Sequence, residues 1–389
     1  MLGIVLSGGG ARGAYEIGFW KAIRRLHIKY DIVTGTSVGA LNGAMMVQKS
    51  YHKAYKIWKY IEQKQIVDNI ESYDKRVLIK FYLRSFFKGG ASVSGLEKIV
   101  QNAVNEKKFF KSKVDFGIVT YNLSKVKPLI VKKNEMKNGY LHHYILASST
   151  CFPFFKVKNI DENKYIDGGF YDNLPINLAI DMGATDIIAV DLKAVGFKKR
   201  VKSKNVNSII ISPRNNIGSF LEFDYNYSRK SISFGYNDTM KTFNRLDGYL
   251  FTFKKGNINK NYNKYYDKFY KIVSILFEKS SKDNFFDDFK TRNSKDVFLN
   301  IIEKCGVIFE LDQSKIYNIK KYNKVLIYEV NKKRTRKSLI TEFLDKKKCI
   351  KKVYDLLMDD VYSNKEKIKS ENFLFHQEII LAVYLYVIS

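Results

Sequence analysis

The sequence has few of the residues on which covalent cross-links and metal sites depend. Its 389 residues include only three cysteines and four prolines. Cys151, Cys305 and Cys349 lie far apart and form no CxxC or cysteine–histidine spacing, which argues against a disulfide framework and a zinc site. Because 45% of the residues are hydrophobic and 15% aromatic, a disordered or collagen-like chain is also excluded. We therefore expect a globular protein of a reducing compartment.

Long apolar segments are lacking as well. The first ten residues, MLGIVLSGGG, have neither a basic start nor an apolar stretch long enough for an export signal. No apolar run reaches the roughly 18 residues that a bilayer span requires. The nearest approach, residues 379–388, is too short to span a bilayer and predicts a buried helix. We therefore expect a cytoplasmic protein, with peripheral membrane association as the alternative.

Acidic residues are outnumbered by basic ones. The 68 lysines and arginines against 39 aspartates and glutamates give a formal net charge of +29 at pH 7. A nucleic acid, an anionic membrane surface or an anionic ligand would each be attracted to such a chain. Since no RNP, zinc-finger or helix-turn-helix signature is present, we expect an anionic membrane surface rather than nucleic acid as the partner. A solvated, lysine-rich surface is the simpler alternative, and the oligomeric state stays open.

What the sequence does contain is an alternation of strands and helices up to about residue 195. Strands are expected at residues 3–6, 31–33, 115–121, in KPLIV up to 131, at 164–166 and at 186–191. GAYEIGFWKAIRRLH and SVGALNGAMMVQK have helical patterns. This order predicts an α/β fold with a central, mostly parallel sheet flanked by helices.

The composition changes after about residue 196, where lysine, asparagine, tyrosine and phenylalanine dominate. Amphipathic stretches such as YDKFYKIVSILFEK predict helices, and KGNINKNYNK and SSKDN are expected to be polar breaks. We therefore divide the chain into a catalytic domain at residues 1–255, with its motifs within 5–195, and a mainly helical region of unknown role at 256–389.

A glycine-rich loop follows the first predicted strand. Within GGGARG, Gly8, Gly10 and Gly13 have the GxGxxG spacing of a dinucleotide-binding loop. That site needs an acid at the carboxyl end of the second strand, whereas Asp31 precedes the apolar residues of that strand. Unobstructed N–H groups at the start of a helix can also stabilise an oxyanion, and we favour this second use.

The second strand leads into GTSVGALNG, in which Gly35, Ser37 and Gly39 form a GxSxG motif before a helix. Strand, sharp turn and helix are the setting of a nucleophile elbow, where Cβ atoms at the two glycines would collide with neighbouring groups. The start of the helix adds positive potential at the hydroxyl, which favours the developing oxyanion. Ser37 is therefore the candidate nucleophile.

A serine nucleophile needs a base. A better candidate for this base than any histidine is Asp167 of KYIDGGFYDNLP, which ends a short strand and is followed by Gly168 and Gly169. Parallel α/β sheets hold their ligands at the carboxyl ends of strands, where Asp167 could reach Ser37. An aspartate in a simple Asp-Gly turn is the alternative. None of the histidines has the surroundings of a catalytic base: His27, His52, His142, His143 and His376.

With GGGARG, GTSVGALNG and IDGGFYDNLP in this order, the chain resembles the patatin-like phospholipases over residues 2–195, or up to 255. The resemblance implies a patatin-like three-layer α/β fold, a Ser37–Asp167 catalytic dyad, and an oxyanion hole in the glycine-rich loop. By position, the loop residues concerned are Gly8, Gly9, Gly10, Arg12 and Gly13. Ser7 stands where an acid often precedes the glycines, and Cys151 where a small residue is common. We expect the first to change loop anchoring and the second to serve packing.

The activity that this resemblance implies is hydrolysis of fatty-acyl esters, of the phospholipase A or lysophospholipase type, without a metal or cofactor. The substrate would be a phospholipid or a lysophospholipid. Asp167 would accept the Ser37 proton, which requires burial to raise its pKa from the usual value of about 3.9. Two alternatives remain open: an acyltransferase that uses the same dyad, and a catalytically silent regulatory module that binds an anionic ligand.

Overall fold

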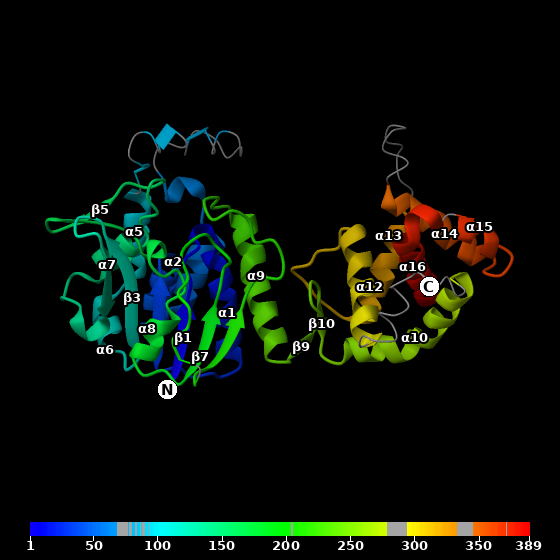
Figure 1. Ribbon diagram of the computed structural model, residues 1–389, viewed down its shortest axis with the longest axis horizontal. Helices are drawn as coiled ribbons and strands as arrows, with labels where there is room; N and C mark the ends of the chain where they lie inside the picture. Colours follow the sequence, from blue (N-terminus) through cyan, green and yellow to red (C-terminus); the bar gives the residue numbers. More distant parts are fainter. Residues whose placement is uncertain are drawn as a thin grey trace. The chain divides into compact units, whose positions relative to one another are not determined.

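The computed structural model describes residues 1–67, 90–92, 94–203, 205–277, 294–332, 345–370 and 372–389, together with residues 77, 80, 81, 84, 85 and 87 (Figure 1). The chain forms two compact units, Met1–Thr242 and Phe243–Ser389. The division into domains at residue 255 stays a prediction, because compactness alone does not define an independently folding domain.

The first unit is built around a mixed, mostly parallel sheet. Its strand order is β5-β6-β3-β2-β1-β7-β8, and β4 also pairs with β3. The central pairs around β1 and β2 are parallel, as is the pair of β7 and β8, whereas β4 and β6 run antiparallel to β3, and β5 to β6. The strands are β1 Leu2–Leu6, β2 Ile32–Thr36, β3 Asp115–Asn122, β4 Lys127–Lys132, β5 Lys158–Ile160, β6 Asn163–Asp167, β7 Asp186–Val190 and β8 Asn207–Ile211.

The predicted strands are all present, and two further ones were not predicted. Strand β2 starts after Asp31 and continues beyond the predicted end to Thr36. Thr34 and Thr36 can be buried in this strand because their hydroxyls donate to backbone carbonyls. Asp31 lies at the amino end of β2, where its carboxylate accepts the N–H of Leu2. This is the wrong end for a ribose contact. The strands β5 and β8 are the additions.

Helices cover both faces of this sheet. Helix α8 (Ile176–Asp181) packs on one face, where Ala179 meets Val5. Helix α2 (Val38–Val47) packs on the other, where Gly43 lies over Leu6, whose side chain points away from that of Val5. The remaining helices of the unit are α1 Ala14–Arg25, α3 Tyr51–Lys59, α5 Ser94–Ala103, α6 Glu106–Lys111, α7 Leu141–Ser148, α9 Tyr225–Thr242 and the 3-10 helices η1 Gly10–Gly13, η2 Gln63–Gln65, η3 Lys133–Glu135 and η4 Gly168–Phe170.

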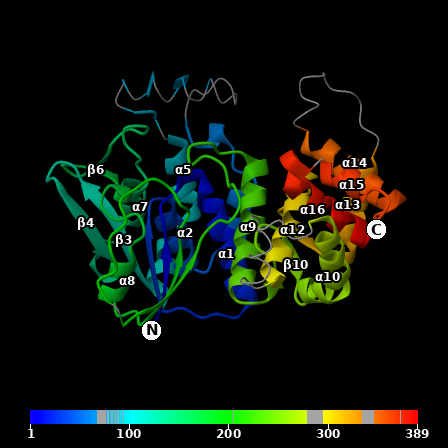
Figure 2. The ribbon, with the colours of Figure 1, turned by 45° about the vertical axis from the view of Figure 1, so that its right-hand side comes forward.

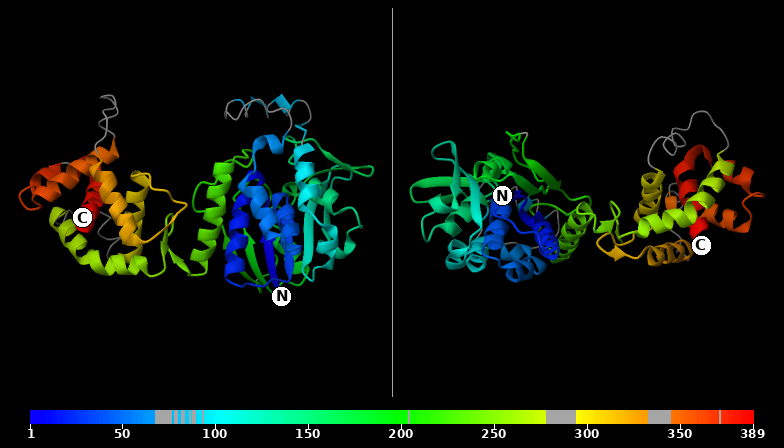
Figure 3. Two further views of the ribbon diagram at one scale, coloured as in Figure 1. Left: turned by 180° about the vertical axis from the view of Figure 1, so that it is seen from behind. Right: turned by 90° about the horizontal axis from the view of Figure 1, so that it is seen from below.

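Helix α9 runs beside α1, as Figures 2 and 3 show from two sides. A Cβ at Gly18 would come within 2.0 Å of the Ile232 carbonyl oxygen, and one at Gly235 within 1.9 Å of the Tyr15 carbonyl oxygen. The two glycines therefore allow the helices to approach closely. The first unit thus has three layers: the sheet lies between α8 on one face and α1 and α2 on the other. The predicted α/β fold class is confirmed.

The second unit is mainly helical, as predicted. Helix α16 (Asn372–Ile388) contacts each of the other helices that the structure describes in this unit, and its residues 379–385 are buried. The predicted buried helix is thus confirmed. The other elements are α10 Asn257–Leu276, α12 Ser294–Ile308, α13 Ile319–Asn331, α14 Lys346–Asp359, α15 Lys365–Ser370 and a small sheet of β9 Leu246–Asp247, β10 Thr252–Lys254 and β11 Ile316–Tyr317.

One predicted break was wrong. Most of KGNINKNYNK forms the first turns of α10 rather than a loop, because Ile258 and Asn261 within it are buried against the core of the unit. The other predicted break, SSKDN, lies outside the described residues. Within the described parts of the chain, no helix combines the length and apolarity that crossing a bilayer would require.

Candidate active site

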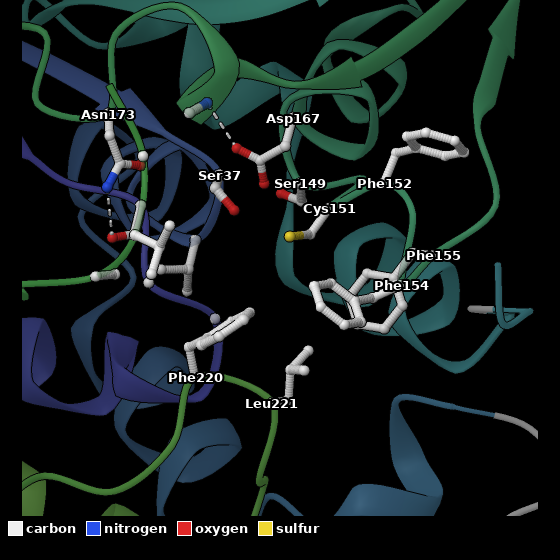
Figure 4. A pocket seen from close by; sticks show the side chains of 18 of the residues that line it. Ser37, Ser149, Cys151, Phe152, Phe154, Phe155, Asp167, Asn173, Phe220 and Leu221 are labelled. Carbon is white, nitrogen blue, oxygen red and sulfur yellow. Dashed lines mark hydrogen bonds between the residues drawn. The ribbon is translucent and has the colours of Figure 1, made fainter. Parts of the chain in front are cut away.

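The register of strand β3 brings Ser37 and Asp167 to the same place. Strand β2 pairs with β3 up to Thr36, which lies opposite Val119, and β6 places Asp167 opposite Thr120, the next residue of β3. Strand β4 occupies the other edge of β3 over residues 117–122, so β2 and β6 share one edge and follow each other along it. Ser37 comes directly after β2, and both side chains line one cavity (Figure 4).

Ser37 sits in a strained turn between β2 and α2. Its φ of 55° lies in the left-handed region, which non-glycine residues rarely adopt and which is enriched at functional sites. A Cβ at Gly35 would come within 2.3 Å of the Gly39 carbonyl oxygen, and one at Gly39 within 2.4 Å of the Leu6 carbonyl oxygen. Neither position accepts a side chain, and the hydroxyl of Ser37 faces the cavity at the start of α2.

Asp167 is a buried carboxylate at the end of β6, with 6% of its surface exposed. Its backbone N–H donates to Thr150 O at 2.8 Å, and its Oδ1 accepts the N–H of Gly169 at 2.8 Å. Burial raises the pKa of Asp167 to about 6, against the lowering effect of the nearby Ser37 hydroxyl and of the hydrogen bond from Gly169. A carboxylate with this pKa can exchange protons near neutral pH, as a general base must.

In the glycine-rich loop, two backbone N–H groups donate no hydrogen bond to any described residue. The N–H groups of Gly8, Ala11 and Arg12 donate to backbone carbonyls at 2.9 to 3.1 Å. Those of Gly9 and Gly10 donate to no group among the described residues, and both glycines line the cavity. Such amides can receive an anionic oxygen.

Gly8 lies directly beside the turn that carries Ser37. A Cβ on Gly8 would come within 3.2 Å of the Ser37 Cβ and within 2.2 Å of Asn173 Oδ1. The amide of Gly8 donates to the Asn173 carbonyl at 3.0 Å, and the Asn173 side chain returns a long hydrogen bond to Gly8 O (Figure 4). Asn173 therefore holds the start of the loop against the segment that follows Asp167.

The side chain of Arg12 holds the loop from the other side. Its Nε donates to Gly218 O at 2.9 Å, and its Nη1 donates to Leu192 O at 3.3 Å and Lys193 O at 2.8 Å. Arg12 is not among the residues that line the cavity. The last residue of the motif, Gly13, packs against α2, where a Cβ would come within 2.4 Å of Val38.

Ser7 and Cys151, the two departures from the family pattern, both have visible roles. The hydroxyl of Ser7 accepts the N–H of Leu192 at 2.9 Å and so anchors the segment after β7 to the loop. Cys151 lines the cavity, and burial together with the nearby carboxylate of Asp167 raises the pKa of its thiol. The thiol is therefore a packing group rather than a nucleophile at neutral pH.

The cavity beside Ser37 is apolar and has a volume of about 320 Å³. Its lining consists mainly of aromatic and aliphatic side chains, and Ser37 and Asp167 lie at its wall together with Ser149 and the Cys151 thiol (Figure 4). An acyl chain would find a matching environment here. The aromatic part of the lining includes Phe152, Phe154, Phe155, Phe220 and Phe223.

Several supporting residues were not identified from the sequence. The Ser148 hydroxyl accepts the N–H of Ser37 at 2.9 Å, and Asn173 holds Gly8 through the hydrogen bonds given above. Asn42 on α2 donates from Nδ2 to Gly13 O at 3.1 Å and to Glu16 Oε2 at 2.8 Å, which ties α2 to the glycine-rich loop. Asn42 and Asn173 lie within the quoted motifs and Ser148 lies outside them, and none of the three is part of a pattern that predicts its partner.

Residues 4–180 match the model of the family "Patatin-like phospholipase". Over 194 residues the chain is 26% identical to patatin-like phospholipase domain-containing protein 7 of Rattus norvegicus, covering 49% of this chain and 13% of that protein. Over 195 residues it is 29% identical to the lysophospholipase nte1 of Aspergillus terreus, covering 50% of this chain and 12% of that protein. The matched region is thus a small part of both relatives.

Among solved structures, the crystal structure of VipD from Legionella pneumophila is similar with a TM-score of 0.38 and 12% identity, covering 100% of this chain and 91% of that chain.

Proposed function

Since residues 4–180 match the patatin-like phospholipase family model, we propose that the protein is a lipid acyl hydrolase that uses Ser37 as nucleophile and Asp167 as base. The observation that carries this proposal is the meeting of the two side chains at one apolar cavity. There Ser37 occupies a strained elbow, and the pKa of Asp167 is raised to about 6 by burial. The substrate would be a phospholipid or lysophospholipid, with its acyl chain in the cavity.

The reaction begins when Ser37 Oγ attacks the ester carbonyl carbon while Asp167 takes the hydroxyl proton. The carbonyl oxygen becomes an oxyanion, which the amides of Gly9 and Gly10 receive. One such donor is worth about 2.7 to 4 kcal/mol of transition-state stabilisation, so two free amides rival the base in importance. In this scheme Gly8, Arg12 and Gly13 shape the loop: the Gly8 N–H and the Arg12 side chain donate to backbone carbonyls, and Gly13 packs against Val38.

The second half of the reaction returns the proton. Asp167 gives it to the departing alcohol, which leaves an acyl ester on Ser37. It then takes a proton from a water that attacks this ester, and it passes that proton to Ser37 Oγ as the bond to the acyl group breaks and the fatty acid is released. As part of the same proposal, the protein acts from the cytoplasm on a membrane with an anionic surface.

The test is release of fatty acid from a panel of phospholipids, lysophospholipids and triacylglycerols. We expect wild-type activity on at least one class, and a loss of at least about a thousandfold in Ser37→Ala and in Asp167→Asn. Ser50→Ala and Asp161→Asn are matched controls, since neither residue lines the cavity. Activity that survives both active-site changes would overturn the dyad.

The same panel separates the alternatives. Transfer of the acyl group to an added alcohol, in preference to water, would identify an acyltransferase. A folded protein that is inactive on every lipid would favour a regulatory module.

A further inference from the structure

The segment that follows β7 exposes large apolar side chains at the cavity. We call residues 192–203 the β7 loop. Val195 is 89% exposed and Phe197 is 69% exposed, although both line the same cavity as Ser37. Phe170, which lies next to the Asp-Gly-Gly motif and also lines the cavity, is 43% exposed. Neighbouring exposed hydrophobic residues beside a functional cavity indicate a surface that binds a partner.

Backbone hydrogen bonds hold the tip of this loop in place. The N–H of Phe197 donates to Gly169 O at 2.9 Å, and its carbonyl accepts the N–H of Asn173. Further along, Asn177 Nδ2 donates to Arg200 O at 3.0 Å, and Asn177 Oδ1 accepts the N–H of Lys202 at 2.9 Å. Because the apolar tip is bonded to the segment after Asp167, its exposure is built into the fold.

Basic residues lie on both sides of the apolar tip along the β7 loop. Two of the five basic side chains of the loop make an ion pair or a hydrogen bond: Lys198 pairs with Asp191 at 2.7 Å, and Lys193 donates to Pro213 O. Lys199, Arg200 and Lys202 are exposed, and the ammonium of Lys199 lies 3.3 Å from the centre of the Tyr171 ring. An exposed apolar tip in a loop that also carries exposed cations matches the two parts of an anionic lipid surface, its acyl layer and its headgroups.

We propose that the β7 loop docks the protein on anionic membranes, with Val195 and Phe197 entering the acyl layer and the exposed cations binding the headgroups. The cavity mouth then opens onto the lipid, so a substrate acyl chain passes from the bilayer to Ser37 without crossing water. The choice of a lipid surface over a protein partner follows from charge complementarity and from the position of the tip at a cavity lined by phenylalanines. Delivery of substrate rests on the proposed function, but docking itself does not.

The experiment measures sedimentation with vesicles in the Ser37→Ala background, where no lipid is consumed. The vesicles are phosphatidylcholine, alone or with about one third phosphatidylserine. We expect the double variant Arg200→Gln/Lys202→Gln to bind the anionic vesicles at least about tenfold more weakly, with a loss that added salt reduces. We expect Val195→Ser/Phe197→Ser to bind at least about tenfold more weakly at every salt concentration.

Matched controls come from the turn between β3 and β4. There Val126 is 74% exposed between two exposed lysines, and none of the three lines the cavity. Val126→Ser and Lys125→Gln/Lys127→Gln should bind vesicles like the background protein. Unchanged thermal midpoints of all variants establish that each is folded.

A direct readout of insertion uses the single variant Phe197→Trp. The two native tryptophans, Trp20 and Trp58, are buried in the first unit, so a change in emission on vesicle addition reports the new side chain. We expect a blue shift with anionic vesicles, and none for Val126→Trp. The proposal is overturned if the Phe197→Trp emission stays unchanged on bound vesicles, or if both loop variants bind like the background protein.

Failure of docking and failure of the proposed function are distinguishable. All binding measurements use a protein without the nucleophile, so loss of ester hydrolysis in wild type with normal docking would refute the enzyme alone. Normal hydrolysis of lipid in detergent, together with vesicle binding that the loop substitutions leave unchanged, would refute docking alone.

Discussion

The backbone N–H of Ser37 donates to the Oγ of Ser148 at 2.9 Å, and the same hydroxyl donates to the Val119 carbonyl at 2.6 Å. Helix α7 thereby holds the strained turn against β3. Removing the hydroxyl leaves a buried N–H without a partner, at a cost of about 1 to 3 kcal/mol. We predict that Ser148→Ala lowers the free energy of unfolding by that amount, measured by urea denaturation, and lowers kcat more than it raises KM.

Ser149→Ala is the control for this prediction. The Ser149 hydroxyl donates to the Ile145 carbonyl within its own helix, so no N–H of another element loses its acceptor. Equal unfolding free energies for the two variants would contradict a role of Ser148 in holding the turn.

The raised pKa of Asp167 predicts the pH dependence of the activity. The carboxylate must be ionised to take the Ser37 proton, and burial raises its pKa from 3.8 to about 6. We therefore expect kcat/KM for a soluble ester to fall as pH drops, with its midpoint near pH 6. A rate that stays constant down to about pH 4, the usual range of an aspartate, would contradict this role.

Glu16 predicts a pH dependence of stability. It is buried, its Oε2 accepts Asn42 Nδ2, and its Oε1 has no partner among the described residues. Burial raises the pKa of Glu16 well above the usual 4.5, so the folded protein keeps a proton that the unfolded chain releases. Above pH 4.5 the wild-type protein therefore loses stability as pH rises toward the folded pKa.

Glutamine cannot lose this proton. We expect the free energy of unfolding of Glu16→Gln, relative to wild type, to increase between about pH 4 and pH 8, measured in urea. Asp161→Asn, which changes an exposed carboxylate, is the control. The same difference between Glu16→Gln and wild type at both pH values would show that Glu16 is ionised in the folded protein.

The contacts of Arg12 predict that activity depends on the hydrogen-bonding geometry of its guanidinium rather than on its positive charge. Its guanidinium donates to three backbone carbonyls on two segments, which a lysine ammonium cannot reproduce in the same geometry. We expect Arg12→Lys to lower kcat about ten- to a hundredfold, because small displacements of an oxyanion loop are costly. If the positive charge were what mattered, Arg12→Lys would retain most of the activity that Arg12→Ala loses.

The turn around Ser37 could be predicted from the sequence, because glycine is required wherever a Cβ would collide with neighbouring backbone. Gly35 and Gly39 flank Ser37 since any Cβ there would meet backbone, and this constraint is visible as spacing. The meeting of Ser37 with Asp167 depends on the register of β2 and β6 along one edge of β3, which no local pattern encodes. The motif order and the family resemblance supplied that expectation instead.

The missed features have physical reasons of their own. Strand β5 has only three residues, too few to form a pattern, and β8 exposes most of its residues, so its apolar run does not alternate. The first turns of α10 look polar, but Asn261 is buried through hydrogen bonds with Tyr384 and Asn323. Such partners lie more than 60 residues away along the chain, beyond the reach of a sequence window.

The most direct test of the dyad is covalent trapping. A fluorophosphonate transfers its phosphonyl group to an activated serine Oγ, fluoride leaves, and the base takes the hydroxyl proton. We predict one adduct per chain, located by peptide mass spectrometry on Ser37, absent in Ser37→Ala and formed at least about a hundredfold more slowly in Asp167→Asn. An adduct on another serine, or equal rates in wild type and Asp167→Asn, would contradict the account.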